Sequence, residues 1–368
     1  MNKPTIRCPI LLSESETNFA YNQLTFEYEK YKVVITYSIN KNKSNNTAIY
    51  FLPGKGNYWY YNHVRRRYPA YDFFSIDLPG FGFNANYETG LYTYENSTTK
   101  KKFTQPNNYY DDMDLVFEML NNSLLDLKTY LKTTLDKSYS TNNLMGLSTG
   151  GFIALHHIWK LQILNNSDSY FQIDKLLLIS PLTRFYFGSK YMDIGIHLLN
   201  NFISLFSYKF DYGIFRSASN LYSDEINRLL NSIYDEEAKS KKPKPTEINI
   251  RKVLLDDDKS ITSGYITTTE NTIQKMINSK KKINIPVRMV CSLTNSSESL
   301  FDADSILKPD YMLEDISKIC GNNNFFHSQF KCGHDAMCEP YETYQNDGKS
   351  DMDNISYENI MDYLFEIN

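Results

Sequence analysis

The strongest constraint on the fold of this chain is a glycine-rich run around one serine, Gly146-Leu147-Ser148-Thr149-Gly150-Gly151. A short strand pattern over 143–146 precedes it, and a helical pattern over 149–161 follows it. A strand and a helix joined so closely can approach each other only where the side chains at the crossing are very small. Gly146 and Gly150 meet this demand, so the run predicts a tight strand–turn–helix unit with a serine at its tip.

Patterns on both sides of this run predict a parallel sheet wrapped by helices. Strands and helices alternate along most of the chain, which is typical of this class. The expected strands cover 71–77, 143–146, 175–180, 285–291 and 325–330, and the expected helices cover 58–67, 110–135, 149–161, 311–319 and 355–365. Two further β-rich stretches, 32–39 and 47–52, lie on either side of a polar turn and predict a hairpin at the antiparallel end of the sheet.

The alternation stops over 183–282, which holds an aromatic amphipathic stretch, 191–206, and a linker-like segment, 239–245. We expect this region to be a helical cap inserted into the core, with residues 1–182 and 283–368 forming the core.

Composition excludes several classes of protein. The formal net charge of −4 does not favour binding to nucleic-acid phosphates. Five cysteines among 368 residues do not form a disulfide framework. The apolar run near the N-terminus is too short for a secretory signal, and no stretch approaches the ~18 apolar residues of a membrane span. We therefore expect a cytoplasmic protein.

The serine motif also has a chemical meaning. In a G-x-S-x-G turn between a strand and a helix, the serine Oγ is exposed above the sheet, and the positive end of the helix faces it. Ser148 is therefore predicted to be a nucleophile.

A serine nucleophile needs a base, which in this type of site follows the serine and the acid along the chain. Four of the six histidines lie on expected helices: His63, His156, His157 and His197. His327 and His334 remain. His334 follows a β-like run and Gly333, as a base carried on a loop would, so His334 is preferred and His327 is the alternative.

Several motifs occur in a fixed order: Phe51-Leu52-Pro53-Gly54, Asn57-Tyr58, 75–82 (SIDLPGFG), 146–151, 177–182 (LLISPL), Ile285-Pro286-Val287 and Gly333-His334-Asp335. Together they resemble the monoglyceride-lipase-like (serine aminopeptidase-like) branch of the α/β hydrolases. The resemblance spans nearly the whole chain apart from the cap. The chain departs from this branch at Pro53 and Leu147, where the branch usually or often has histidine.

The resemblance implies the remaining roles. The acid is Asp310, at the start of a helix, with Asp302 and Asp304 as alternatives. A helix-end carboxylate is the competing interpretation of Asp310. The backbone N–H groups of Lys55 and Thr149 are the expected oxyanion donors. The candidate substrate contacts are Leu147 and Tyr58, together with Phe202 and Phe206. The two phenylalanines come from the amphipathic pattern of the cap rather than from the resemblance, and this apolar face can either line a channel above Ser148 or pack the cap onto the core.

A metal site is the competing interpretation near the C-terminus, where Cys320, His327, Cys332, His334 and Cys338 lie within 19 residues. Structural zinc sites usually pair their ligands as C-x₂₋₄-C, and this spacing contains no such pair. We therefore expect no metal and no cofactor.

The sequence thus predicts an α/β-hydrolase fold and a carboxylic-ester hydrolase acting through an acyl-enzyme on Ser148. The expected substrate is a lipid-like ester, of monoacylglycerol or lysophospholipid type, or a small ester. Two alternatives remain open: an acyltransferase with the same catalytic residues, and a catalytically silent binding protein. The sequence does not indicate an oligomeric state.

Overall fold

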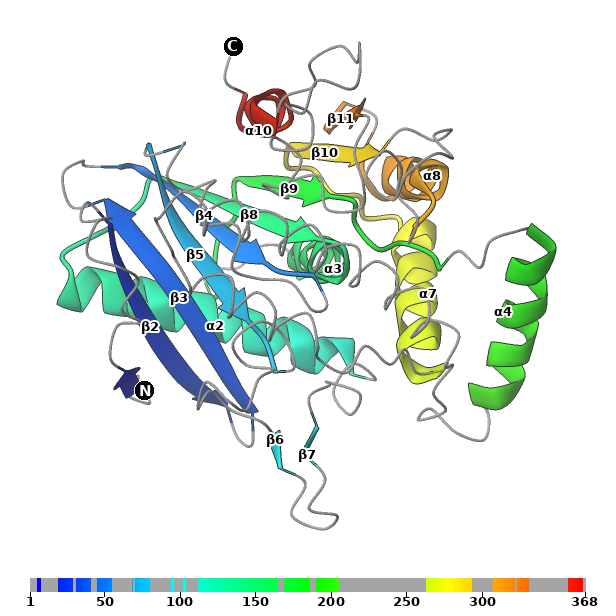
Figure 1. Cartoon of the computed structure of the whole chain (residues 1–368), viewed down its shortest axis with the longest axis horizontal. Coiled ribbons are helices and arrows are strands. Elements are labelled where there is room, and N and C mark those ends of the chain that lie inside the picture. The colour runs from blue at the N-terminus through cyan, green and yellow to red at the C-terminus, as the bar shows by residue number, and fades with distance from the viewer. Residues whose placement is uncertain are drawn as a thin grey trace, which may run out of the picture.

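The computed structural model describes residues 5–7, 19–28, 31–40, 45–54, 68, 70–79, 94–95, 102–103, 112–164, 169–185, 190–204, 263–292, 307–321, 323–330 and 357–366. A nine-stranded sheet with the order β1-β2-β3-β5-β4-β8-β9-β10-β11 forms its centre (Figure 1). These strands are β1 (Thr5–Arg7), β2 (Phe19–Tyr28), β3 (Tyr31–Asn40), β4 (Thr47–Leu52), β5 (Tyr71–Asp77), β8 (Thr141–Leu147), β9 (Lys175–Ile179), β10 (Val287–Ser292) and β11 (Phe325–Phe330). A separate two-stranded pair joins β6 (Tyr94–Glu95) and β7 (Lys102–Phe103).

The sheet is antiparallel at one side and parallel over the rest. The pairs β1–β2, β2–β3 and β3–β5 are antiparallel, and every pair from β5 to β11 is parallel. The prediction of a mostly parallel sheet is confirmed.

The predicted hairpin between 32–39 and 47–52 is wrong. β3 pairs with β2 on one side and with β5 on the other, while β4 lies in parallel between β5 and β8. The connection from β3 to β4 therefore skips one position in the sheet. The antiparallel partner is β2, which ends where Tyr28 faces Tyr31.

Helices cover both faces of the sheet, as predicted (Figure 1). They are α2 (Met113–Thr134), α3 (Thr149–Ile163), α4 (Lys190–Ser204), α7 (Ser263–Asn278), α8 (Pro309–Ile319) and α10 (Tyr357–Phe365). Buried residues of α2, α3, α7 and α8 share one core cluster with Tyr50 and Leu52, whereas α10 shares the other with Ile49 and Phe51. Alternate residues of β4 thus face opposite cores, as the pleat of a strand requires.

Helix α2 shows how the sequence defines one of these covers. Asp112 caps its start, because the carboxylate accepts hydrogen bonds from the N–H groups of Asp114 and Leu115 at 3.1 and 3.0 Å. Apolar residues at helical spacing then bury one face, including Val116, Leu120, Leu124, Leu127 and Leu131.

Two of the described helices lie within the range expected for the cap, and they differ in their packing. α7 contacts both α3 and α8 of the core, and it supplies Ile266, Ile273 and Met276 to the larger core cluster. α4 packs against α7, with the buried Asn200 donating to Thr267 Oγ1 at 2.8 Å. The boundaries 183 and 282 stay a prediction, and we propose that α7 belongs to the core layer.

Candidate active site

Ser148 lies on the sharp turn between β8 and α3. Its backbone has φ 52° and ψ −117°, a conformation with positive φ that residues other than glycine rarely adopt. Its N–H donates to the carbonyl of Ile179 at 3.0 Å, and its own carbonyl accepts from the N–H groups of Phe152 and Leu182 at 3.1 and 2.9 Å. The Ser148 side chain makes no capping hydrogen bond to α3. The turn is therefore fixed through the backbone, and its hydroxyl is not used to cap the helix.

Three glycines make this turn possible. A Cβ on Gly146 would lie 2.5 Å from the carbonyl oxygen of Gly150. A Cβ on Gly150 would lie 2.1 Å from the carbonyl oxygen of Leu52, and one on Gly151 would lie 2.7 Å from Pro181 Cβ. Real Cβ atoms do not approach other atoms so closely, so strand, turn and helix fit together only with hydrogen at these positions.

The turn Pro53-Gly54 lies directly beside the serine. A Cβ built on Gly54 would lie 3.2 Å from Ser148 Cβ and 3.4 Å from Leu147 Cγ. The loop expected to supply one oxyanion donor therefore begins in contact with the nucleophile. Lys55 itself lies outside the described residues.

The register of the parallel strands brings other chain segments to the same edge of the sheet. Leu147 faces Ile179, Ile179 faces Val290, and Ser292 faces Phe330. The chain therefore leaves β8, β10 and β11 at one common edge, where ligands bind in open α/β sheets. Asp302 and Asp304 follow β10, and His334 lies four residues after Phe330. These three residues lie outside the described part of the structure.

Thr149, the other expected oxyanion donor, is the first residue of α3 and is almost completely buried. Its Oγ1 lies 2.5 Å from the hydroxyl of Tyr265, which is in the first turn of α7. Sequence analysis gave no indication of Tyr265, because 116 residues separate the two hydroxyl-bearing side chains.

Two residues that follow β9, Arg184 and Phe185, contact the helices α8 and α7. Arg184 donates to both carboxylate oxygens of the buried Asp315 on α8, with Nε at 2.7 Å from Oδ2. Next to it, the ring of Phe185 packs edge-on against the ring of Tyr265 with centroids 5.6 Å apart. The segment after β9 and the first turn of α7 thus meet beside the turn that carries Ser148.

Asp310 lies in the first turn of α8 with an exposed side chain. A carboxylate at a helix start is favourable without any catalytic role. The acid that orients a catalytic histidine is usually buried. Asp310 would therefore have to be shielded from water by its pairing with His334 to act as this acid. The assignment of Asp310 stays a prediction.

His156 and His157 are buried in α3, on the helix that leads away from Ser148. Burial lowers the pKa of His156 to about 4 and that of His157 to about 3. Both rings are therefore neutral near pH 7. His327 lies exposed on β11.

The candidate substrate contacts have different environments. Leu147 is fully buried in the core cluster shared with α10, so it can shape the site only from below the turn. Phe202 on α4 is 61 % exposed. Tyr58 and Phe206 lie outside the described residues.

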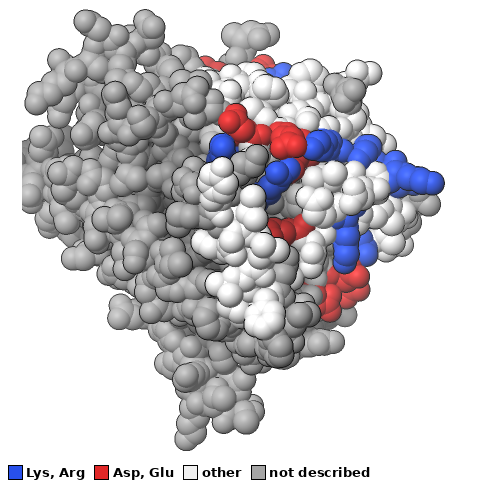
Figure 2. Space-filling view, turned by 90° about the vertical axis from the view of Figure 1, so that its right-hand side faces the viewer, with Lys and Arg blue, Asp and Glu red and all other residues white. Residues whose placement is uncertain are grey.

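Phe202 belongs to an apolar outer face of α4, defined by the exposed side chains of Tyr191, Ile194, Leu198, Leu199 and Phe202. The opposite side of α4 meets α7 through polar groups, including His197 Nδ1 at 2.9 Å from Glu270 Oε1. White, uncharged surface extends over α4 in Figure 2. The described part of α4 therefore presents this face to solvent and encloses no channel.

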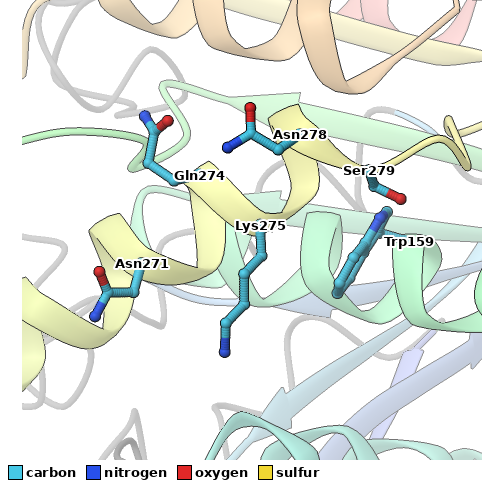
Figure 3. A pocket seen from close by; sticks show the side chains of 6 residues that line it. All are labelled: Trp159, Asn271, Gln274, Lys275, Asn278 and Ser279. Carbon is cyan, nitrogen blue, oxygen red and sulfur yellow. The ribbon is translucent and has the colours of Figure 1, made fainter.

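A shallow pocket of about 650 Å³ lies between α3 and the C-terminal half of α7. Figure 3 shows its lining side chains, which are Trp159, Asn271, Gln274, Lys275, Asn278 and Ser279. Trp159 follows Ser148 by eleven helical positions, or about 16 Å along α3. This pocket is therefore separate from the serine site.

Within the described ranges, no three His, Cys, Asp or Glu side chains are grouped as a metal site would require. Cys320, a member of the candidate zinc cluster, is a buried free thiol. Among the helices that the structure describes, none has the length and apolar character needed to cross a bilayer.

No family model matches the chain, and no curated protein matches it by sequence. Solved structures match it over nearly their whole length. A soluble variant of monoglyceride lipase from Saccharomyces cerevisiae, in complex with a substrate analogue, is similar at 12 % identity and a TM-score of 0.55, covering 93 % of this chain and 94 % of that chain. An enol-lactonase from Burkholderia xenovorans matches at 12 % identity and a TM-score of 0.47, covering 93 % and 99 %. Of these two, only the likeness to the monoglyceride lipase structure is used as support for the fold.

The strand order, the strained serine turn and this likeness together define the class of protein. The chain has the α/β-hydrolase fold. The fold predicted from the sequence is confirmed.

Proposed function

We propose that this protein is a serine hydrolase that cleaves a carboxylic ester through an acyl-enzyme on Ser148. The observation that carries the proposal is the turn itself. Ser148 is held in a strained backbone conformation, its side chain does not cap α3, and the Pro53-Gly54 turn lies against it. Strain of this kind, which costs on the order of 1–3 kcal/mol, concentrates at functional sites.

In the proposed reaction, Ser148 Oγ attacks the ester carbonyl carbon while His334 accepts its proton. The backbone N–H groups of Lys55 and Thr149 donate to the oxyanion of the tetrahedral intermediate. The C–O bond to the alcohol then breaks, and His334 returns the proton to the departing oxygen. Water repeats these steps on the acyl-enzyme, which releases the acid and restores Ser148. Asp310 is the proposed partner of His334.

For the substrate, we propose a lipid-like ester of the monoacylglycerol or lysophospholipid type. The motif resemblance to the monoglyceride-lipase-like branch supports this choice, as does the fold likeness to a monoglyceride lipase. The enzyme would then bind an acyl chain next to Ser148. Each methylene buried in such a site contributes about 0.8 kcal/mol, or roughly fourfold in kcat/KM.

The test of the reaction is labelling with a fluorophosphonate probe. Wild-type protein should be labelled at Ser148, whereas Ser148→Ala should not react. His334→Ala should react much more slowly, because the serine then lacks its base. Labelling of Ser148→Ala to the wild-type extent would refute the proposal.

The test of the substrate class is kcat/KM for p-nitrophenyl esters from acetate to laurate, below their micellar concentrations. A rise of roughly fourfold per carbon over part of the series supports a lipid-like substrate. A steady fall from acetate onward rejects it and favours a small-ester hydrolase. Adding a competing alcohol to the same assay separates hydrolysis from acyl transfer by the products formed.

A further inference from the structure

The hydrogen bond between Thr149 and Tyr265 joins the serine turn to the first turn of α7. Tyr265 Oη lies 2.5 Å from Thr149 Oγ1, and both residues are buried, at 6 % and 2 % exposure. Tyr265 is the third residue of α7, the helix that brings the chain back from the insertion. A residue outside the sequence motif thus contacts the side chain that directly follows the nucleophile.

The position of the Tyr265 hydroxyl is well defined. Phe185 packs against its ring, and α7 carries it into the same core cluster as α3. Burial raises the pKa of Tyr265, so its hydroxyl stays protonated at neutral pH. A neutral phenol can donate to Thr149 Oγ1 or accept from it, and either arrangement keeps the two oxygens together.

Thr149 matters because its backbone N–H is the proposed oxyanion donor beside Ser148. Oxyanion donors are effective only when they lie about 2.7–3.1 Å from the oxygen of the intermediate. The side chain and the N–H of Thr149 share one Cα. A hydrogen bond that fixes Oγ1 therefore also restricts how the peptide plane before α3 can tilt.

We propose that Tyr265 is a positioning residue of this active site, holding Thr149 by its side chain and thereby aiming the Thr149 N–H at the oxyanion. This inference rests on the proposed serine hydrolase function. Tyr265 acts through Thr149 and does not itself contact the substrate.

The experiment compares Tyr265→Phe, Thr149→Val and the double variant on a p-nitrophenyl ester. Each single variant removes one partner of the same hydrogen bond, so each should lower kcat by about three- to tenfold, the effect of one hydrogen bond. KM should stay within about twofold, because the bond acts on the transition state rather than on ground-state binding. The double variant should be no slower than the slower single variant, since both changes break one interaction.

Two further readouts separate positioning from general stabilisation. The rate of fluorophosphonate labelling should fall by the same factor as kcat, because the probe also places an oxygen in the oxyanion hole, while the final extent of labelling is unchanged. Thr149→Ser, which keeps the hydroxyl, should recover most of the kcat that Thr149→Val loses.

The matched control is Tyr50→Phe. Tyr50 is another buried tyrosine, and its hydroxyl donates to Asn142 Oδ1 at 3.1 Å near the start of β8, at the opposite end of that strand from Ser148. Tyr50→Phe should lower stability to a similar extent and leave kcat unchanged.

The inference is overturned if Tyr265→Phe and Tyr50→Phe lower stability alike while both keep wild-type kcat and labelling rates. It is also overturned if the losses in the double variant multiply. Failure of the proposed function gives a different result, since the wild-type protein would then show neither labelling at Ser148 nor ester turnover.

Discussion

Glycine at position 150 is the residue on which the geometry of the serine turn depends most directly. The carbonyl oxygens of Leu52 and Pro53 lie 2.1 and 2.5 Å from where its Cβ would be. Both are backbone atoms, one at the end of β4 and one in the turn beside Ser148, so they cannot rotate away as a flexible side chain would. Any side chain here must push α3 or the Pro53-Gly54 turn out of place.

Gly150→Ala is therefore expected to destabilise the protein by several kcal/mol, or to abolish ester turnover where it still folds. Urea unfolding and kcat/KM measure the two effects. Gly195→Ala on α4 is the matched control, because apart from the backbone of its own helix no described atom lies within 4 Å of the added Cβ. It should stabilise the helix by up to about 1 kcal/mol. Equal behaviour of the two variants would contradict the packing described here.

Single substitutions also identify which carboxylate is the acid of the proposed active site. Asp310→Asn is expected to lower kcat by up to ~10⁴, because an amide stabilises the unproductive tautomer of the histidine. Asp302→Asn and Asp304→Asn serve as the comparison, with kcat measured for all three proteins. If Asp310→Asn keeps wild-type kcat and one of the other variants loses it, that other residue is the acid.

At the scale of elements, α3 carries two histidines in an apolar environment. The ring of His157 packs against Phe117 with centroids 4.9 Å apart, and neither of its nitrogens has a hydrogen-bond partner among the described residues. Burial is the main cause of the lowered pKa of both His156 and His157. The folded protein therefore disfavours protonation of these two imidazole rings.

This predicts how stability depends on pH. A histidine whose folded pKa is depressed contributes stability that is present above its unfolded pKa of about 6.5 and is lost as the pH falls toward the folded value. For His156 and His157 the folded values are about 4 and about 3. Each histidine should lower the free energy of unfolding by roughly 1.4 kcal/mol for every pH unit below about pH 6.

Urea unfolding of wild type and His157→Leu at pH 7, 6 and 5 tests the prediction. As the pH falls, the free energy of unfolding of the variant should decrease less steeply than that of the wild type. The difference in slope should be about 1.4 kcal/mol per pH unit, which corresponds to one bound proton. Parallel curves for the two proteins would mean that His157 takes up a proton in the folded state, against its buried position.

Elements also show what could be predicted from the sequence. The strands rich in aromatic residues were predicted closely, and β5 and β11 have the predicted bounds. The hairpin failed because neighbours in sequence usually pair, whereas β4 lies beyond β5 in the sheet. Helix α7 was missed because buried threonines, Thr267, Thr269 and Thr272, interrupt its apolar pattern.

In the candidate site, too, the locally encoded features could be predicted and the long-range contacts could not. The serine turn is encoded within six adjacent residues, so local sterics were enough to predict it. The contacts of Thr149 with Tyr265 and of Arg184 with Asp315 each join residues more than 110 positions apart. No local pattern marks such pairs, because only the completed fold brings them together.

At the scale of the whole molecule, the C-terminal helix completes the second core. α10 supplies Ile360, Met361, Leu364 and Phe365 to the cluster beneath β4, β8 and β9. Polar contacts secure it, since Tyr68 donates to Asp362 at 2.9 Å and Arg288 Nε donates to Glu366 at 2.8 Å. The last described residues of the chain therefore hold together strands from its first and last thirds.

Phe365→Ala is expected to lower the free energy of unfolding by about 3–5 kcal/mol. The centroid of its ring lies 5.0 Å from that of Tyr68 and 4.8 Å from that of Tyr71, so truncation opens a cavity beside these two aromatic rings. Phe202→Ala on α4 is the control, because its side chain is 61 % exposed and alanine is a good helix former. Urea denaturation should show a change within about 1 kcal/mol for Phe202→Ala. A Phe365→Ala protein as stable as this control would contradict the role assigned to α10.

The strained backbone of Ser148 leads to one more prediction. At φ 52° and ψ −117° a glycine is relaxed and an alanine is not. Ser148→Gly should therefore exceed Ser148→Ala in free energy of unfolding by about 1–2 kcal/mol, although neither protein can form an acyl-enzyme. Thermal melting of both variants measures the difference, and an Ala variant at least as stable as the Gly variant would count against strain at this position.

If that difference is found, the most stable version of this protein is not a working one. A population of such chains released from selection for turnover would be expected to drift toward glycine at position 148, gaining stability as it lost its chemistry. A serine kept at position 148 despite that cost in stability would then be explained by a function of its hydroxyl.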